Sequence, residues 1–449
     1  MCRCLPNLYA IGMIRGVLCF WRGCGLLYGI LGIFLQETEK FLFDMRKIYG
    51  TVLMLSAAVG INPVAVMSQG DSRHYAAMSE ETLDSIYSRY GIPGTGLLRE
   101  NYPFDSGYKA GYLAGDDGVQ GNPYSYLWPF SGTLSAVSAI YEATSDKKWL
   151  QVLDERVMPG LEMYADEKRI PPAYASYVNT AAQSDRFYDD NIWLGIDFVD
   201  LYNSTKDAIW LHRAQKIWEF IECGTDDVLG GGIYWCEQKK GSKNTCSNAP
   251  GAVLALKLYG ATSDKRYLEK GRRLYDWTKR NLQDPEDGLY FDNINLKGEI
   301  GRSKFAYNTG QMIEAAVLLY RHTGKKGYLR EAERVAESGY RHFFNGGEGL
   351  DEKGSFRLLN PRDVWFSAVM MRGYAALERV NHNPVYMDAF CRNLDYVWRN
   401  MRDASTGLVD SDWSGTVKDE KKWLLTQAAY SEMLARAAYY RKSNNHQHQ

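Results

Sequence analysis

The chain has 449 residues, of which 45% are hydrophobic and 24% are charged. This is an ordinary globular composition, and it excludes disorder over most of the chain because there is ample apolar surface for a core. The 53 lysines and arginines nearly balance the 54 aspartates and glutamates. The resulting net charge of −1 argues against a nucleic-acid binder that relies on global charge.

The first seventy residues have the pattern of a leader rather than of a domain. Basic residues directly after Met45 precede an apolar run over residues 48–61 and small residues toward Ser68. This order is typical of a secretory signal peptide. We therefore predict a signal peptide over residues 45–68, an upstream extension over residues 1–44, and export to the periplasm, the cell surface or the medium. A membrane-anchored N-terminus is the alternative.

Four cysteines remain beyond this leader: Cys223, Cys236, Cys246 and Cys391. We expect buried free thiols, with a disulfide between Cys236 and Cys246 as the alternative in an oxidising compartment. Their spacing contains no CxxC element and no nearby histidine, which argues against zinc. We expect no metal and no cofactor.

A phrase of about eleven residues recurs through the rest of the chain. Each copy ends near an aromatic residue: Trp149, Trp210, Tyr267, Tyr328 and Tyr386. Each copy also separates an almost wholly apolar segment, such as MIEAAVLLY, from an amphipathic one, such as YLREAERVAESGYRHF. A helix that is apolar on every side is buried, whereas a helix with a charged face borders water. Each repeat of about sixty residues therefore predicts an inner helix, a short polar turn and an outer helix.

A sixth helix pair completes this pattern. Residues 419–441 are predicted to form the last inner helix, and residues 79–90 its outer partner. The sequence thus predicts an all-α fold, an (α/α)6 toroid or six-hairpin barrel, as a single catalytic domain over residues 75–441 with a disordered tail over residues 442–449. An open helical solenoid is the rival, but its familiar repeats of about 34 to 47 residues are shorter. The extra length lies in loops before the inner helices, so a binding site is expected at that end.

The second predicted inner helix opens with two adjacent carboxylates, Asp189 and Asp190. Acids are common in a first helical turn because the free N–H groups and the helix dipole attract negative charge. Two acids beside aromatic residues indicate more than a cap, since the charge of one makes ionising the other costly and raises one pKa. An ionised nucleophile beside a protonated acid is what retaining glycoside hydrolysis requires.

The motif YDDNIW at the start of an inner helix of such a toroid resembles glycoside hydrolase family 76, the endo-acting α-1,6-mannanases. Other family-like pieces follow in order: GGGIYW from Gly230, KNTCSNAPGAVLAL from Lys243 and YNTGQMIEAAVLLY from Tyr307. The resemblance covers about residues 75–441. It implies a retaining endo-hydrolase of α-1,6-mannosidic linkages, with Asp189 as nucleophile and Asp190 as acid/base. Leu194 stands where many relatives have a second aromatic residue, which leaves the preferred substrate open.

Further residues at or near the predicted inner-helix starts are candidates for binding sugar. Aromatic rings can stack on sugar faces, and amides can both donate to and accept from hydroxyl groups. The candidates are Trp128, Tyr188, Asn191, Trp193, Trp235, Asn244, Asn248, Tyr307, Asn308 and Trp365. Core packing of the aromatic residues and helix capping by the asparagines are the alternatives. We expect a monomer that takes a polysaccharide or oligosaccharide substrate, and neither nucleic acid nor membrane as a partner of the mature domain.

Three other functions are compatible with a toroid. A sugar epimerase would need histidines in the cavity, and none of the seven histidines lies at a predicted inner-helix start. A hydrolase of another glycan, including unsaturated ones, stays open. A non-catalytic glycan-binding toroid also stays open, but it need not keep both aspartates, so their presence favours an enzyme.

Overall fold

The computed structural model describes three stretches of the chain: residues 63–110, 122–360 and 364–447. Ser68–Gln449 form one compact unit, and of the other unit, Met1–Met67, only the start of helix α3 is described. The predicted extension over residues 1–44 lies outside the described residues. So does nearly all of the predicted signal peptide over residues 45–68.

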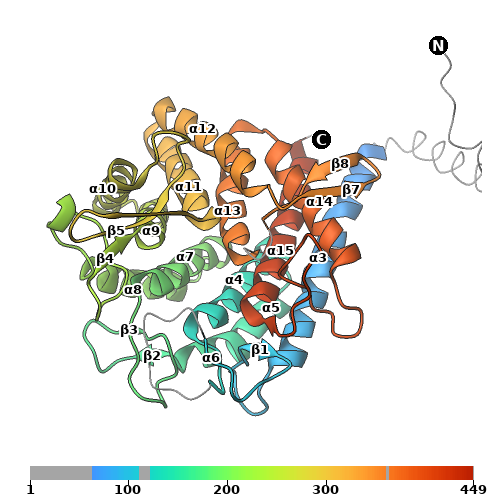
Figure 1. Ribbon diagram of the computed structural model, residues 1–449, viewed down its shortest axis with the longest axis horizontal. Helices are drawn as coiled ribbons and strands as arrows, with labels where there is room; N and C mark the ends of the chain where they lie inside the picture. Colours follow the sequence, from blue (N-terminus) through green and yellow to red (C-terminus); the bar gives the residue numbers. More distant parts are fainter. Residues whose placement is uncertain (1–62, 111–121, 361–363, 448–449) are drawn as a thin grey trace, which may run out of the picture. The chain divides into compact units, whose positions relative to one another are not determined.

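Six long inner helices of the described chain form a closed ring (Figure 1). They are α4 (Leu127–Thr144), α7 (Tyr188–Thr205), α9 (Thr245–Thr262), α11 (Ala306–Thr323), α13 (Val364–Asn381) and α15 (Leu424–Gln447). Consecutive inner helices pack against one another, and α15 packs against α4, which closes the ring. The predicted (α/α)6 toroid is confirmed, and the open solenoid is excluded. Within the described stretches, no helix has the length and apolar character needed to cross a bilayer.

The outer ring carries the charged faces. Its helices are α3 (Pro63–Tyr90), the consecutive segments α5 (Lys148–Val152), η1 (Leu153–Val157) and α6 (Met158–Glu162), then α8 (Ala208–Glu222), α10 (Lys265–Leu282), α12 (Lys326–Phe343) and α14 (Val385–Asn400). In α10, for example, Leu274 and Trp277 are buried whereas Lys270 is exposed. This one-sided burial is what the amphipathic segments predict.

The recurrent phrase forms the turn from each inner helix to its outer partner. Five inner helices are followed by a residue in the left-handed region: Ser145 (φ 58°), Lys206 (φ 62°), Ser263 (φ 61°), Gly324 (φ 69°) and His382 (φ 53°). The side chain of Asp207 then accepts a hydrogen bond from the N–H of Ile209 and caps α8. Asp264 caps α10 in the same way. The repeat in the sequence is therefore a repeat of helix ends and caps.

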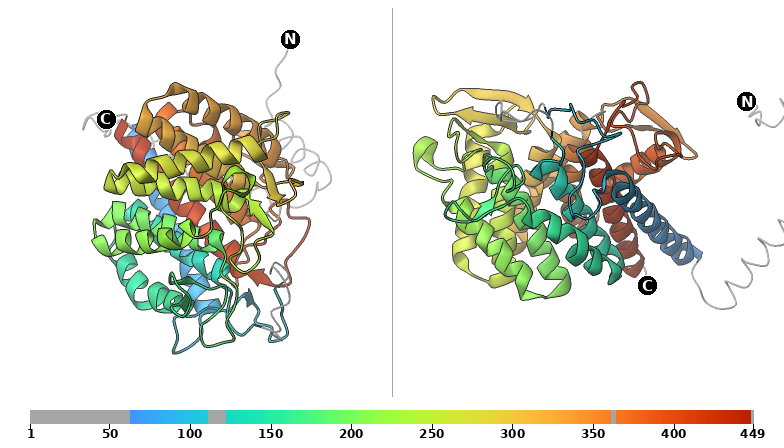
Figure 2. Two further views of the ribbon diagram at one scale, coloured as in Figure 1. Left: turned by 90° about the vertical axis from the view of Figure 1, so that its left-hand side faces the viewer. Right: turned by 90° about the horizontal axis from the view of Figure 1, so that it is seen from below.

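Short strands stiffen the loops that precede the inner helices. They are β1 (Asn101–Tyr102) paired with β9 (Lys422–Trp423), β2 (Ala165–Asp166) with β3 (Ala173–Tyr174), β7 (Glu348–Asp351) with β8 (Gly354–Arg357), and the antiparallel sheet β4 (Ser242–Asn244), β5 (Phe291–Asn295), β6 (Ile300–Lys304). β4 runs directly into α9, and β6 ends just before α11. In the right-hand view of Figure 2, the yellow β5–β6 hairpin and the orange β7–β8 hairpin both lie at the upper end of the helices.

The chain end differs from the sequence-based expectation. Helix α15 continues through residues 442–447, where the sequence predicts a disordered tail. The Nζ of Lys442 donates to the carbonyl of Ala143 at 2.9 Å, and the hydroxyl of Ser443 donates to the carbonyl of Tyr439 at 3.0 Å. These bonds tie the last turns of the helix to the toroid and to itself.

The four cysteines beyond the leader are free thiols. Cys236, Cys246 and Cys391 are buried, as expected, whereas Cys223 is exposed. Cys236 and Cys246 therefore do not form the alternative disulfide in this structure.

Candidate active site

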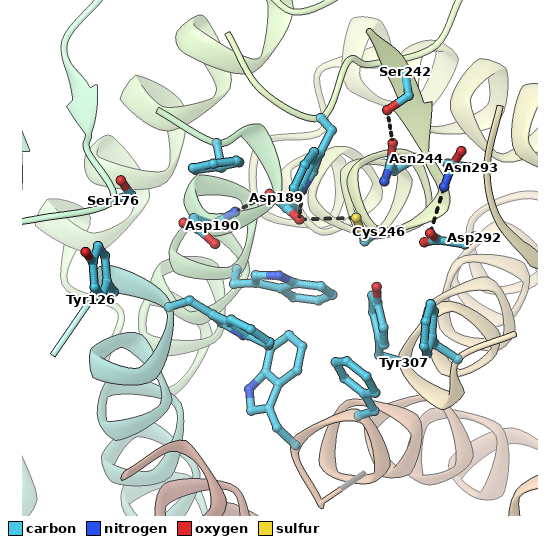
Figure 3. Close-up of a pocket in the computed structure, with 17 residues that line it drawn as sticks. Tyr126, Ser176, Asp189, Asp190, Ser242, Asn244, Cys246, Asp292, Asn293 and Tyr307 are labelled. Atoms are coloured by element: carbon cyan, nitrogen blue, oxygen red, sulfur yellow. Dashed lines mark hydrogen bonds between the residues drawn. The ribbon is translucent and has the colours of Figure 1, made fainter. Parts of the chain in front are cut away.

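Five inner helices direct the side chain of their second residue into one cavity (Figure 3). These residues are Trp128, Asp189, Cys246, Tyr307 and Trp365. The cavity has a volume of about 360 Å³, within the range of small-ligand sites. It lies at the end of the toroid where the inner helices begin, as the long loops predict.

Loops, strands β4 and β5, and further residues of α7 and α13 complete the walls. The remaining lining residues are Tyr126, Ser176, Phe187, Asp190, Trp193, Trp235, Ser242, Asn244, Asp292, Asn293, Phe305 and Phe366. No described residue that lines the cavity is a lysine, arginine or histidine. Within the described stretches, no group of three or more His, Cys, Asp or Glu side chains is arranged to hold a metal ion.

A buried arginine positions the start of α7. Arg186 donates through Nε and Nη2 to the two carboxylate oxygens of Glu237, at 2.7 and 2.5 Å, and through Nη1 to the carbonyl of Pro171 at 2.9 Å. The backbone N–H of Tyr188 donates to the carbonyl of Trp235 at 3.0 Å. The loop before α9 is thereby attached alongside the start of α7, which brings the indole of Trp235 to the carboxylates.

Hydrogen bonds hold the carboxylate of Asp189 on both oxygens. Oδ2 accepts from Nε1 of Trp235 at 3.0 Å and from Sγ of Cys246 at 3.1 Å. Oδ1 accepts from the backbone N–H of Asp190 at 3.0 Å. These donors stabilise the ionised form and offset part of the effect of burial, which raises the pKa of Asp189.

The carboxylate of Asp190 has a different environment. Burial raises its pKa well above the ordinary value, and the negative charge of Asp189 raises it further. Among the described residues, none donates a hydrogen bond that would lower this pKa and offset those two effects. The proton shared by the coupled pair therefore resides on Asp190 over a pH range in which Asp189 is ionised.

Aromatic rings form the opposite wall of the cavity. Trp365 packs edge-on against both Trp128 and Trp193, with ring centroids 5.3 and 5.2 Å apart. Tyr307 lies against Phe366 with centroids 4.3 Å apart. Such packing fixes the orientation of the rings, so the cavity presents flat apolar surfaces opposite two carboxylates.

The predicted asparagines separate into two kinds. Asn244 lines the cavity. Asn191 is fully buried, and its amide accepts from the N–H and donates to the carbonyl of Tyr174. Asn248 makes the same pair of bonds to Ile233. Both amides are occupied in anchoring a loop to the start of an inner helix, so the structure does not bring them to the cavity.

Two further candidates also lie away from the cavity wall. Tyr188 is buried and stacks on Phe220 of α8, with ring centroids 4.7 Å apart. Asn308, the third residue of α11, is fully buried. The first residue of α7 points outward because successive side chains on a helix diverge by about 100°.

The structure thus brings eight of the twelve predicted site residues together. They are Asp189, Asp190, Trp128, Trp193, Trp235, Asn244, Tyr307 and Trp365. Cys246 was not predicted, although its place as the second residue of an inner helix is a signal that could have identified it. Asp292 and Asn293 lie on β5, whose pairing with β4 has no periodic signal in the sequence. The Asn293 amide donates to Asp292 at 2.7 Å, and burial raises the pKa of Asp292.

Comparison with known proteins assigns the chain to a family. The family model of glycosyl hydrolase family 76 matches residues 101–447. The chain belongs to glycosyl hydrolase family 76. A putative mannan endo-1,6-alpha-mannosidase of Schizosaccharomyces pombe is 23% identical over 231 residues, which make up 49% of this chain and 51% of that protein. The chain thus spans about half the length of this curated relative.

Solved structures of family 76 share the fold. A family 76 mannosidase from Bacteroides thetaiotaomicron superposes with a TM-score of 0.74 and 32% identity, covering 83% of this chain and 100% of that one. An inactive variant of an alpha-1,6-mannanase from Salegentibacter sp., in complex with alpha-1,6-mannotriose, superposes with a TM-score of 0.64 and 25% identity, covering 81% and 99%. Two adjacent aspartates are replaced by asparagine in that variant.

Proposed function

We propose that the protein is a retaining endo-hydrolase of α-1,6-mannosidic linkages in mannan-type polysaccharide. The observation that carries this proposal is the pair of adjacent carboxylates in unequal environments, Asp189 held by three donors and Asp190 with a pKa that burial and the charge of Asp189 raise. Both face a cavity walled by aromatic rings. This combination suits a flat, uncharged sugar substrate and a reaction that needs a nucleophile and an acid.

The proposed reaction has two steps. In the first, the ionised carboxylate of Asp189 attacks the anomeric carbon while Asp190 gives its proton to the departing glycosidic oxygen. The bond between the anomeric carbon and that oxygen breaks, and a glycosyl ester forms on Asp189. In the second, the Asp190 carboxylate takes a proton from water, whose oxygen attacks the anomeric carbon and displaces Asp189. Two displacements at one carbon retain its configuration.

The relatives support the substrate class. One is named as a putative mannan endo-1,6-alpha-mannosidase, and another is an alpha-1,6-mannanase whose variant with two adjacent aspartates replaced is inactive. Asp189 and Asp190 are the adjacent pair of this chain that faces the cavity. A non-catalytic glycan-binding toroid would not require two carboxylates with opposed protonation states.

We also propose that the mature protein is an exported monomer. The basic, apolar and small residues in order over residues 45–68 support export. Sequencing the N-terminus of protein from its native host should find a mature end between residues 66 and 70. Peptides from residues 1–44 in that preparation would contradict the proposed extension.

The decisive experiment measures products from linear and branched α-1,6-mannan. We expect short α-1,6-manno-oligosaccharides from the linear polymer, and proton NMR of the first-formed reducing end should show the α anomer. Asp154→Asn makes the same kind of substitution at an exposed position of the outer segment η1, away from the cavity. This control should give the same products as the wild type. A β anomer as first product would remove the nucleophile role from Asp189. Binding of the polymer without any product would support the binding toroid instead.

A further inference from the structure

A cysteine occupies the helix position next to the proposed nucleophile. Cys246 is the second residue of α9, as Asp189 is the second residue of the neighbouring α7. Sγ of Cys246 lies 3.1 Å from Oδ2 of Asp189, and Nε1 of Trp235 lies 3.0 Å from the same oxygen. Figure 3 shows this sulfur directed at the carboxylate from the α9 side of the cavity. The proposed mechanism gives the thiol no task.

The thiol keeps its proton in this position. Cys246 is 4% exposed, and burial together with the nearby charges of Asp189 and Asp292 raises its pKa well above the ordinary value. A protonated thiol beside an ionised carboxylate can only donate to it. Tyr307 on α11 also lies beside the thiol, and its own pKa is raised well above the ordinary value, chiefly by burial. The sulfur is therefore enclosed between two inner helices and is aimed at Asp189.

The surroundings of Asp189 make this donor important. The titratable groups beside it are Asp190 on its own helix, Cys246 on α9 and Tyr307 on α11, and Asp292 on β5 lies beside the last two. Among the described residues that line the cavity there is no cation. The ionised form of Asp189 is therefore stabilised by neutral donors, and two of them, the indole N–H and the thiol, meet on Oδ2.

We propose that Cys246 is a positioning residue whose thiol donates to Oδ2 of Asp189 and, with the Trp235 indole, holds the carboxylate ionised and correctly oriented toward the sugar. This inference rests on the proposed function of Asp189 as nucleophile. It assigns no covalent step to the sulfur.

Kinetics of three variants test the inference. Cys246→Ala removes the donor, so we expect kcat to fall about tenfold, the order expected for a hydrogen bond to a charged group, with KM nearly unchanged. The acidic limb of the kcat/KM profile should move to higher pH, because losing a donor to the ionised form raises the pKa of Asp189. Cys246→Ser, which keeps a donor, should restore most of both. Cys391→Ala, which removes a buried thiol from the outer helix α14, should change neither.

A measurement independent of turnover separates this inference from the proposed function. Carbon-13 NMR of labelled aspartate carboxyls, with the Asp189 signal assigned by its loss in Asp189→Asn, follows the titration directly. We expect the Asp189 titration to move upward in Cys246→Ala and to stay in place in Cys391→Ala. An unchanged titration and an unchanged pH profile would overturn the positioning role, even in an active mannanase. If no mannan is cleaved, the proposed function fails while the titration still decides the role of the thiol. Cys246→Val, a non-donor of similar volume, carries the same test if the alanine variant is unstable.

Discussion

Helix α7 carries carboxylates at two levels, partly buried ones at its start and a buried one further on, and their surroundings differ. At its start, Asp189 and Asp190 face a cavity without a lining cation, and Asp189 accepts from neutral donors alone. Two turns further on, Asp197 lies in the middle of the toroid, where it accepts from the hydroxyl of Ser135 at 2.5 Å and lies 3.4 Å from Nη1 of Arg372. The same helix therefore presents acids without cations at one level and an acid beside a cation at the other.

The central level is a closed charge network. Arg372 donates to both oxygens of Glu432 at 2.7 and 2.9 Å, and Arg436 donates to Glu432 at 2.6 Å. The two guanidinium groups outweigh the effect of burial and lower the pKa of Glu432 to about 2. At Asp197, burial outweighs Arg372, and the pKa is raised to about 6. Glu432, which has two guanidinium partners, stays ionised and joins two inner helices, whereas Asp190, which has no cation beside it in the cavity, keeps a proton available for transfer.

The largest expected effect is a loss of activity, and it tests whether only the carboxylates at the start of α7 take part in the reaction. Asp189→Asn and Asp190→Asn should each lower kcat/KM by at least about 10²–10⁴-fold, the usual range for loss of general acid–base catalysis. Asp197→Asn, on the same helix but outside the cavity, should leave kcat of the folded protein within about threefold. Mannan hydrolysis and circular dichroism of all three variants check this. Full activity in either cavity variant would show that the pair is a helix cap.

The second effect concerns stability rather than chemistry. Arg372→Met removes the cation shared by Glu432 and Asp197, and breaking a buried ion pair from one side typically costs about 3–5 kcal/mol. Urea unfolding monitored by tryptophan fluorescence should show a lower midpoint. Exposed Arg266→Met is the matched control and should unfold like the wild type. If Arg372→Met were as stable as the wild type, the central network would not be what holds this level of the toroid together.

The sequence predicts the level with the proposed catalytic pair better than the central one. The toroid follows from the sixty-residue repeat, because helix ends and caps such as Ser263 and Asp264 are local features. Asp189 and Asp190 stand out because two acids open an apolar helix. Arg372 gives no comparable signal, since its partner Glu432 lies 60 residues away on the next inner helix, α15, and no local pattern links the two.

The asparagines and the strands show a second limit of sequence reasoning. Asn244 and Asn248 are four residues apart in one motif, yet one lines the cavity and the other anchors the backbone of Ile233. Only the direction of each side chain on the folded helix start separates them. Asp292 reaches the cavity because β5 pairs with β4, in the register Asn293 to Asn244. This contact joins two loops about fifty residues apart and leaves no periodic pattern.

The smallest expected effect is a pH-dependent change in stability, which tests the contrast between the two levels of α7. The folded protein raises the pKa of Asp190 well above its ordinary value, so the native state favours the protonated form. In the unfolded chain the pKa of Asp190 is about 3.9. Below that pH the carboxyl is protonated in both states, so its ionisation does not lower the free energy of unfolding. The cost grows as the pH rises from there through the folded pKa. Asp190→Asn removes this cost, so the variant should be more stable than the wild type at pH 7 and equal to it near pH 3.

Each unit by which the folded pKa of Asp190 exceeds the unfolded pKa corresponds to about 1.4 kcal/mol of unfolding free energy. In a chain of this size, that free energy shifts Tm by about 2 °C. Thermal unfolding of Asp190→Asn at pH 7 and pH 3, with Asp154→Asn as the exposed control, measures the difference. A variant that melts below the wild type at pH 7 would mean that the ionised Asp190 stabilises the start of α7 through the free N–H groups and the helix dipole. The cavity carboxylate would then resemble the central ones, and the contrast between the two levels of α7 would be lost.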